Sequence, residues 1–164
     1  MAVGPIVTVV FENRDTIRFQ VQEMVRVERM LSDAQVQAEL DVYNPLIPGP
    51  GELSATLFVE LTDEDGLREW LPKLVGIERA VELRIGTGPG ADAVRSTPEA
   101  AHEEQLTRAE VTASVHYIRL ALSPAQVERF AAGPSVLAVD HPAYRHATDL
   151  PDGTRAELLA DLRP

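Results

Sequence analysis

Stretches in which apolar and polar residues alternate, or in which apolar residues run together, predict the β-strands of this chain. A strand points successive side chains to opposite faces, so alternation indicates one buried face and an unbroken apolar run indicates a strand covered on both faces. The segment 5–11 is such a run, and 53–61 alternates along its length. On these grounds we predict six strands, namely 5–11, 16–21 as its hairpin partner, 53–61, 81–85, 112–122 and 136–139.

Apolar residues spaced three, four and seven apart predict helices between these strands. Val21, Met24, Val25 and Leu31 have this spacing, so we expect a helix over about 20–31, although 20–23 also fits the end of the preceding strand. Two Ser-x-x-Gln sequences have the spacing of a capping box, in which each side chain bonds a free backbone N–H at the start of a helix. They begin predicted helices at 32–43 and 123–132, and further helices are expected near 65–74 and 152–162.

Strands and helices are interspersed along the chain, and the predicted opening hairpin argues against a purely parallel sheet. We therefore expect one α+β domain over residues 1–164, with a mixed or mostly antiparallel sheet of five to six strands and three to five helices packed on it. The segment 86–110 is rich in glycine and charged residues, so we expect an exposed, mobile connection there.

Composition and charge exclude several classes of function. Fifteen Lys and Arg against 26 Asp and Glu give a net charge of −11. This charge repels phosphate backbones and anionic lipids, so we expect neither a nucleic-acid nor a membrane partner. The absence of cysteine excludes disulfides, thiolate metal sites and cysteine nucleophiles. No apolar run has the length of a membrane-spanning helix and no basic leader begins the chain, so a cytoplasmic location is expected.

Two polar residues fall at positions predicted to be apolar. His116 shares a strand face with Ile118 and Leu120, and a buried imidazole must hydrogen-bond or bind a ligand. It is therefore either a core histidine held by a neighbouring acceptor, or a metal ligand or general base. Glu28 follows Met24 by four residues and so lies in the helical stripe. A carboxylate there requires a partner, either a distant arginine or a metal ion.

A second group of polar residues completes a candidate pocket. Asp140 and His141 follow a predicted buried strand, and strand ends often present polar groups to a cleft. Gln20 and Glu23 form a polar patch at the start of the predicted helix, whereas His102 and His146 lie in polar segments and are expected to be solvated. We expect the pocket to comprise Gln20, Glu23, Glu28, His116 and Asp140. The alternative is a non-haem iron, manganese or zinc centre held by Glu28, His116 and His141.

Five sequence segments, in a fixed order along the chain, carry a resemblance to a known family: FENRDTIRFQVQEMVRVERM (11–30), ELDVYNPLIPG (39–49), GIERAV (76–81), ASVHYIRLAL (113–122) and DHPAYRHA (140–147). In these segments the chain resembles an uncharacterised bacterial family, catalogued as the domain of unknown function numbered thirty-five hundred and one. Genes of that family often lie beside those for rubrerythrin-like di-iron proteins and iron–sulfur oxidoreductase subunits, which implies surroundings of redox metabolism or peroxide stress. Members commonly begin with an extra basic, helical segment that this chain lacks, so a divergent role is an alternative.

Three functional hypotheses follow. The first is a small cytosolic accessory or ligand-binding protein of redox or metal metabolism, with a polar pocket around His116. The second is a metal-dependent enzyme, in which Asp140 orients a metal-binding histidine. The third is a structural subunit of a larger oxidoreductase or a homodimer. The sequence does not decide whether the protein is an enzyme.

Overall fold

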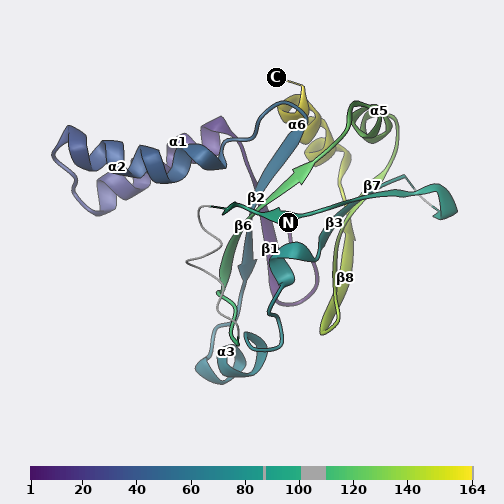
Figure 1. The fold of residues 1–164 in the computed structure, drawn as a ribbon, viewed down its shortest axis with the longest axis horizontal. Helices are drawn as coiled ribbons and strands as arrows, with labels where there is room; N and C mark the ends of the chain where they lie inside the picture. The colour runs from purple at the N-terminus through teal and green to yellow at the C-terminus, as the bar shows by residue number, and fades with distance from the viewer. Residues whose placement is uncertain (87, 101–109, 164) are drawn as a thin grey trace.

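The computed structural model describes residues 1–86, 88–100 and 110–163, and these residues form an α+β fold built on two antiparallel sheets (Figure 1). The strands lie in the order β1-β2-β6-β5 in the first sheet and β4-β3-β7-β8 in the second. The first sheet consists of β1 (Val7–Glu12), β2 (Glu52–Val59), β6 (Val115–Ala121) and β5 (Thr97–Pro98). The second consists of β4 (Asp92–Arg95), β3 (Val81–Ile85), β7 (Ser135–His141) and β8 (Tyr144–Asp149).

Helices lie at both ends of the sheets. Figure 1 shows α5 and α6 beside one another at one end and α3 at the other. None of the helices in the described ranges is both long and apolar enough to cross a membrane. The α-helices of the described residues are α1 (Arg14–Val27), α2 (Asp33–Tyr43), α3 (Glu64–Trp70), α5 (Pro124–Ala132) and α6 (Asp152–Leu162). Three short 3₁₀ helices are η1 (Asn44–Leu46), η2 (Ile77–Arg79) and η3 (Gly88–Gly90).

Both sheets contribute to one hydrophobic core. Val9 and Leu57 of the first sheet and Leu83 and Leu137 of the second are fully buried in the same cluster. Successive residues of a strand point to opposite faces, so the inner face of each sheet is apolar and the intervening residues form its outer face. The outer face of the first sheet is the part of the fold that positions the site described below.

The helix caps that the sequence predicts are present in the structure. The Ser32–Gln35 and Ser123–Gln126 capping boxes are both formed, and they begin α2 and α5. In α3 the side chain of Asp63 accepts a hydrogen bond from the backbone N–H of Gly66. These contacts satisfy backbone donors that a helix leaves free in its first turn.

The predicted α+β class and mostly antiparallel pairing are confirmed, but the strands are divided between two four-stranded sheets. Alternation marks a strand without specifying which strand it pairs with. Three strands of the described residues were not predicted, because β4 and β5 are short and β8 is mostly exposed. Residues 92–98 therefore do not form the expected exposed connection, and Val94 and Ser96 are buried. Residues 101–109 of that connection lie outside the described residues.

The prediction of a hairpin strand over 16–21 is wrong, because this segment belongs to α1. Asn13 caps the helix by accepting hydrogen bonds from the backbone N–H groups of Asp15 and Thr16, and the Thr16 hydroxyl accepts from the backbone N–H of Asn13. Over only six positions, an alternating run of residues can fit both the period of a strand and the period of a helix. Here the capping box favours the helix.

The α1–α2 hairpin, residues 14–43, projects away from the two sheets (Figure 1). Its buried residues are Ile17 and Val21, and no residue of α1 after Val21 is buried. No side chain of α2, all of which the structure describes, is buried. The hairpin therefore contacts the rest of the molecule mainly near its base.

Candidate functional site

His116 lies in β6 with its side chain in the core, as the alternation of that strand predicts. It is 2% exposed and is opposite Leu57 of β2. Its Nε2 atom lies 2.8 Å from Oγ1 of Thr112 and 3.0 Å from the carbonyl oxygen of Ala113. A carbonyl oxygen only accepts hydrogen bonds, so the contact with Ala113 requires the proton on Nε2. The inward orientation of His116 is confirmed.

A carboxyl group does lie near His116 in the core, but it belongs to Glu78. Burial lowers the pKa of His116, and the negative charge of Glu78 opposes that shift. Glu78 is 3% exposed, and its Oε2 atom has no hydrogen-bond partner among the residues that the structure describes. No sequence pattern marks this position, because Glu78 lies in a 3₁₀ helix of three residues, too short to show a period.

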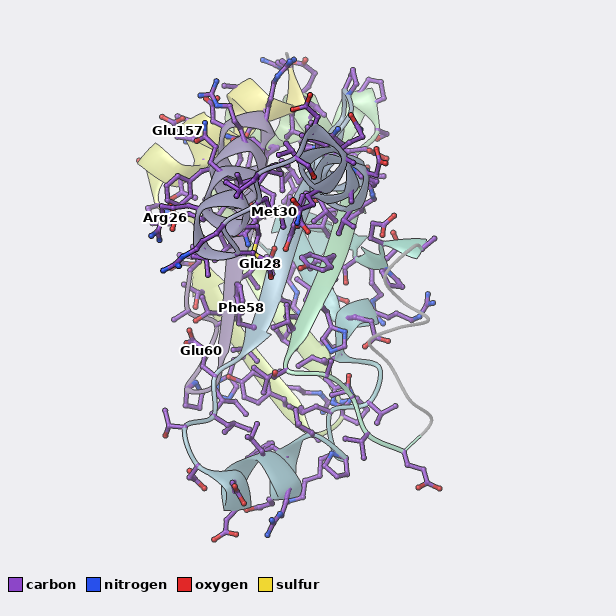
Figure 2. All side chains as sticks on the ribbon, turned by 90° about the vertical axis from the view of Figure 1, so that its left-hand side faces the viewer. Arg26, Glu28, Met30, Phe58, Glu60 and Glu157 are labelled. Atoms are coloured by element: carbon purple, nitrogen blue, oxygen red, sulfur yellow. The ribbon has the colours of Figure 1, made fainter. Side chains whose placement is uncertain are left out.

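The prediction that Glu28 faces the interior is wrong, because the residue is exposed. Glu28 is the C-cap of α1, and its backbone N–H donates to the carbonyl oxygen of Met24. The predicted helix over about 20–31 instead ends at Val27, and the second half of α1 extends past the sheets (Figure 1), so Glu28 remains exposed. Figure 2 views the hairpin from its free end and shows Glu28 near Met30, with Phe58 and Glu60 below them on the sheet.

Asp140 and His141 end β7, and their contacts hold the turn into β8. His141 Nε2 donates to the carbonyl oxygen of Val75 at 3.0 Å, and Nδ1 accepts from the backbone N–H of Ala143 at 3.2 Å. Asp140 accepts from Arg145 at 3.1 Å and lies 3.5 Å from Arg95. These contacts therefore give both polar side chains a structural role in the turn between β7 and β8.

The structure does not bring the proposed metal ligands together. Glu28 lies at the exposed end of α1, whereas His116 and His141 belong to different sheets. Within residues 1–86, 88–100 and 110–163, no group of three or more His, Asp or Glu side chains could hold a metal ion. His146 is exposed, as expected, and His102 lies outside the described residues.

A cavity of about 280 Å³, lined by both apolar and polar side chains, lies between the base of the hairpin and the outer face of the first sheet. Its carboxylate is Glu12, at the end of β1. Glu12 accepts a hydrogen bond from Thr16 Oγ1 at 2.6 Å through one oxygen and from Thr56 Oγ1 at 2.7 Å through the other. Two hydroxyl groups thus fix the orientation of this carboxylate. The lining residues are Glu12, Ile17, Gln20, Tyr43, Leu46, Thr56, Phe58, Val115 and Tyr117.

Aromatic side chains form much of the wall of this cavity. The chain contains four phenylalanines, three tyrosines and one tryptophan, and three of these eight, Tyr43, Phe58 and Tyr117, line it. Burial raises the pKa of Tyr117, and the nearby Tyr43 and Glu12 raise it further. The Tyr117 hydroxyl therefore stays protonated and lies within electrostatic reach of the Glu12 carboxylate.

The fold places these residues together through one tight connection. Asn13 directly follows the last residue of β1 and caps α1, and both Glu12 of β1 and Gln20 of α1 line the cavity. In the sheet, Thr56 is paired with Tyr117. Of the five residues predicted to form a pocket, Gln20 lines this cavity, whereas His116 points to the opposite face of β6. Glu12, Thr56 and Tyr117 were missed because polar residues that alternate with core residues are normally solvated.

The comparisons with known proteins agree with this fold and leave its role open. No curated protein matches the chain. It is similar to the crystal structure of a protein of unknown function from Burkholderia pseudomallei K96243, with 36% sequence identity and a TM-score of 0.86. That match covers 99% of this chain and 82% of the other. The model of the family described as "Protein of unknown function (DUF3501)" matches residues 1–162. The chain therefore belongs to the DUF3501 family, as the resemblance of its sequence segments indicated.

Proposed function

We propose that this protein binds a small organic cation, such as an amine or a quaternary ammonium compound, in the cavity lined by Glu12. The observation that carries the proposal is the combination of one anchored carboxylate with three aromatic side chains in a single cavity. Aromatic rings attract cations through the negative charge of their faces, and such cages are a common means of recognising ammonium groups.

The hydrogen bonds of Glu12 leave it able to bind a ligand. Each carboxylate oxygen accepts one bond from a threonine, and a carboxylate oxygen can accept two. An ammonium ion could therefore bind Glu12 without displacing Thr16 or Thr56. The net charge of −11 adds a general attraction for cations.

The dimensions of the cavity limit the ligand. A volume of about 280 Å³ is at the lower end of the range for small-molecule sites. The apolar side chains of Ile17, Leu46 and Val115 would contact the non-polar part of the ligand, and the Gln20 amide could hydrogen-bond a polar substituent. The proposal thus retains a ligand-binding role but centres it on Glu12 instead of His116, and it includes no metal ion.

Calorimetric titration with choline tests this proposal. The control ligand is the neutral alcohol in which carbon replaces the choline nitrogen, because it has the same shape without the charge. We expect choline to bind and the neutral alcohol to bind at least about tenfold more weakly. Equal binding of the two, or binding of neither choline nor methylammonium, would contradict the proposal.

Two matched variants locate the site. Glu12→Gln keeps the size of the side chain and removes its charge, so it should weaken choline binding by about tenfold or more. Glu60→Gln is the control, since Glu60 also accepts a hydrogen bond from a threonine, Thr8 Oγ1 at 2.8 Å, but does not line the cavity. An equal loss of affinity in both variants would show that the effect comes from overall charge.

A further inference from the structure

A cleft lies between the two helices of the α1–α2 hairpin and the segment that follows α2. Its volume is about 540 Å³, within the range of small-molecule sites. We call it the hairpin cleft and define it by six of the residues that line it, Arg14, Ile17, Arg18, Val21, Leu40 and Ile47. Ile17 also lines the cavity at Glu12, whereas the other five do not, so the two sites are distinct.

Part of the lining of the hairpin cleft is aliphatic. Ile17 and Val21 of α1 are buried, and Leu40 of α2 and Ile47 after η1 are half-buried. These side chains come from both helices and from the chain that returns to the sheet, so together they form a concave apolar surface. Such a surface binds the hydrocarbon part of a ligand but does not by itself select one.

The charged residues of the hairpin cleft are both arginines, in a chain with 26 acidic and 15 basic residues. Arg14 is the first residue of α1. Cations are unfavourable there, because the aligned peptide dipoles give the start of a helix a partial positive charge. Arg18 follows by four positions, a spacing at which like charges on a helix repel each other. The stability of α1 therefore gives no reason for two arginines at these positions.

Acidic residues of the same chain balance only part of this positive charge. Asp15 pairs with Arg18 at 3.0 Å. Arg14 has no ion pair with any residue in the part of the chain that the structure describes. Glu12, the other acid close to Arg14 in the sequence, lines the other cavity, where both its oxygens accept hydrogen bonds from threonines. Arg14 is exposed, so its guanidinium is available to an anion from solution.

We infer that the hairpin cleft binds a carboxylate with an apolar tail, such as a fatty-acid anion. The planar guanidinium of Arg14 can hold both oxygens of a carboxylate through two parallel N–H donors, and the tail packs on the aliphatic lining. An inorganic anion would leave that lining in contact with water, whereas a neutral lipid would leave Arg14 without a partner. Only a ligand with both parts matches the whole cleft, and its charge is opposite to that of the ligand proposed at Glu12.

Titration of the ¹⁵N-labelled protein with octanoate, followed by NMR, tests this assignment. One control ligand is octanamide, which has the same chain length without the charge, and the other is acetate, which has the charge without the chain. We expect octanoate to bind with a Kd of about 1 mM or lower, and at least about tenfold more tightly than either control. The shifted backbone amide signals should belong to residues 14–22 and 40–47. No binding of octanoate up to about 5 mM, equal binding of a control, or shifts only elsewhere in the chain would overturn the assignment.

Two arginine variants locate the carboxylate. Arg14→Gln removes a charge that lines the cleft, so it should weaken octanoate binding by about fivefold or more. Arg29→Gln removes the same charge from an exposed residue of the same hairpin that does not line the cleft, and it should change the affinity by less than about twofold. An equal loss in both variants would show that the anion responds only to overall charge.

The stability of Arg14→Gln without ligand provides a second measurement. Because a cation is unfavourable at the start of a helix, its removal should leave the midpoint temperature of thermal unfolding unchanged or raise it. A loss of octanoate binding in a variant of undiminished stability then reflects the lost carboxylate contact. A lowered midpoint temperature would show that Arg14 has a structural role and would contradict its assignment to a ligand.

Discussion

His116 Nε2 lies 2.8 Å from the Thr112 hydroxyl, and both residues are almost fully buried. The strand face that carries His116 is otherwise aliphatic, so this hydrogen bond and the contact with Ala113 compensate for the removal of the imidazole from water. The two partners are four positions apart in the sequence, and Thr112 precedes the first residue of β6. The histidine is therefore held by the segment that leads into its own strand.

Replacement of Thr112 should destabilise the protein through this contact. Thr112→Val keeps the shape of the side chain and removes its hydroxyl, so we expect a loss of about 1–2 kcal/mol in the free energy of unfolding. Urea denaturation measures the change. Thr8→Val is the control, because the Thr8 hydroxyl bonds Glu60 at an exposed position, and it should change stability by less than about 0.5 kcal/mol. Similar losses in the two variants would show that burial of the hydrogen bond is unimportant.

The buried imidazole should make stability depend on pH. Burial lowers the pKa of His116 in the folded protein below the ordinary 6.5, so the unfolded chain binds a proton more readily. The stabilising contribution of the neutral His116 is fully present above pH 6.5, and it is lost as the pH falls through that value toward the pKa in the folded protein. The free energy of unfolding changes by at most about 1.4 kcal/mol per pH unit in this range. The difference in unfolding free energy between wild type and His116→Gln, measured from pH 8 to pH 5, isolates this effect from the other histidines. A difference that stays constant or grows on acidification would contradict it.

Glu82 should stabilise the outer face of the second sheet through its two arginine partners. It bonds Arg95 at 2.5 Å and Arg84 at 2.8 Å. Burial alone would raise its pKa, but the hydrogen bonds from Arg95 and Arg84 outweigh burial and lower it. Glu82→Gln should therefore cost about 1–3 kcal/mol at neutral pH. The cost should disappear as the pH falls below 4.5, the ordinary pKa of a glutamic acid side chain.

The control for this prediction is Glu69→Gln, which removes an exposed ion pair with Lys73. Exposed pairs contribute little because water and salt screen them, so the change should be below about 0.5 kcal/mol. Thermal unfolding at several pH values measures both variants. An equal or larger effect of Glu69→Gln would show that the partial burial of Glu82 does not matter.

Gly4 should tolerate no side chain. Its φ of +82° is unfavourable for other residues, and a Cβ atom would lie 2.4 Å from both the Tyr144 hydroxyl oxygen and Cγ of His146. That hydroxyl donates to the carbonyl oxygen of Val3 at 2.8 Å, so the clash would also disturb the attachment of the N-terminal segment. We expect Gly4→Ala to lower the free energy of unfolding by about 2–4 kcal/mol.

Gly153→Ala provides the comparison for Gly4. Gly153 lies in the first turn of α6 and nothing would lie within 4 Å of its Cβ. Alanine favours a helix over glycine, so this change should be neutral or stabilise by up to about 1 kcal/mol. A loss with Gly153→Ala comparable to that with Gly4→Ala would contradict the steric explanation.

Features that depend on residues close together in the chain can be predicted from the sequence. The capping boxes at Ser32 and Ser123 begin helices where their spacing predicts, and the alternation of β6 directs His116 inward. These predictions succeed because a helix repeats every three to four residues and a strand every two, so a short window defines the face of each residue. The family likewise follows from short segments in a fixed order.

Which of these faces meet depends on how the elements pack in three dimensions. Periodicity placed Glu28 in an apolar stripe, yet the residue is exposed because α1 extends beyond the sheets that its stripe would contact. The buried carboxylate is instead that of Glu78, in a 3₁₀ helix without a period. The cavity at Glu12 arises because the hairpin covers polar residues on the outer face of a sheet. A pattern along the chain shows which side chains share a face, whereas burial depends on whether another element packs on that face.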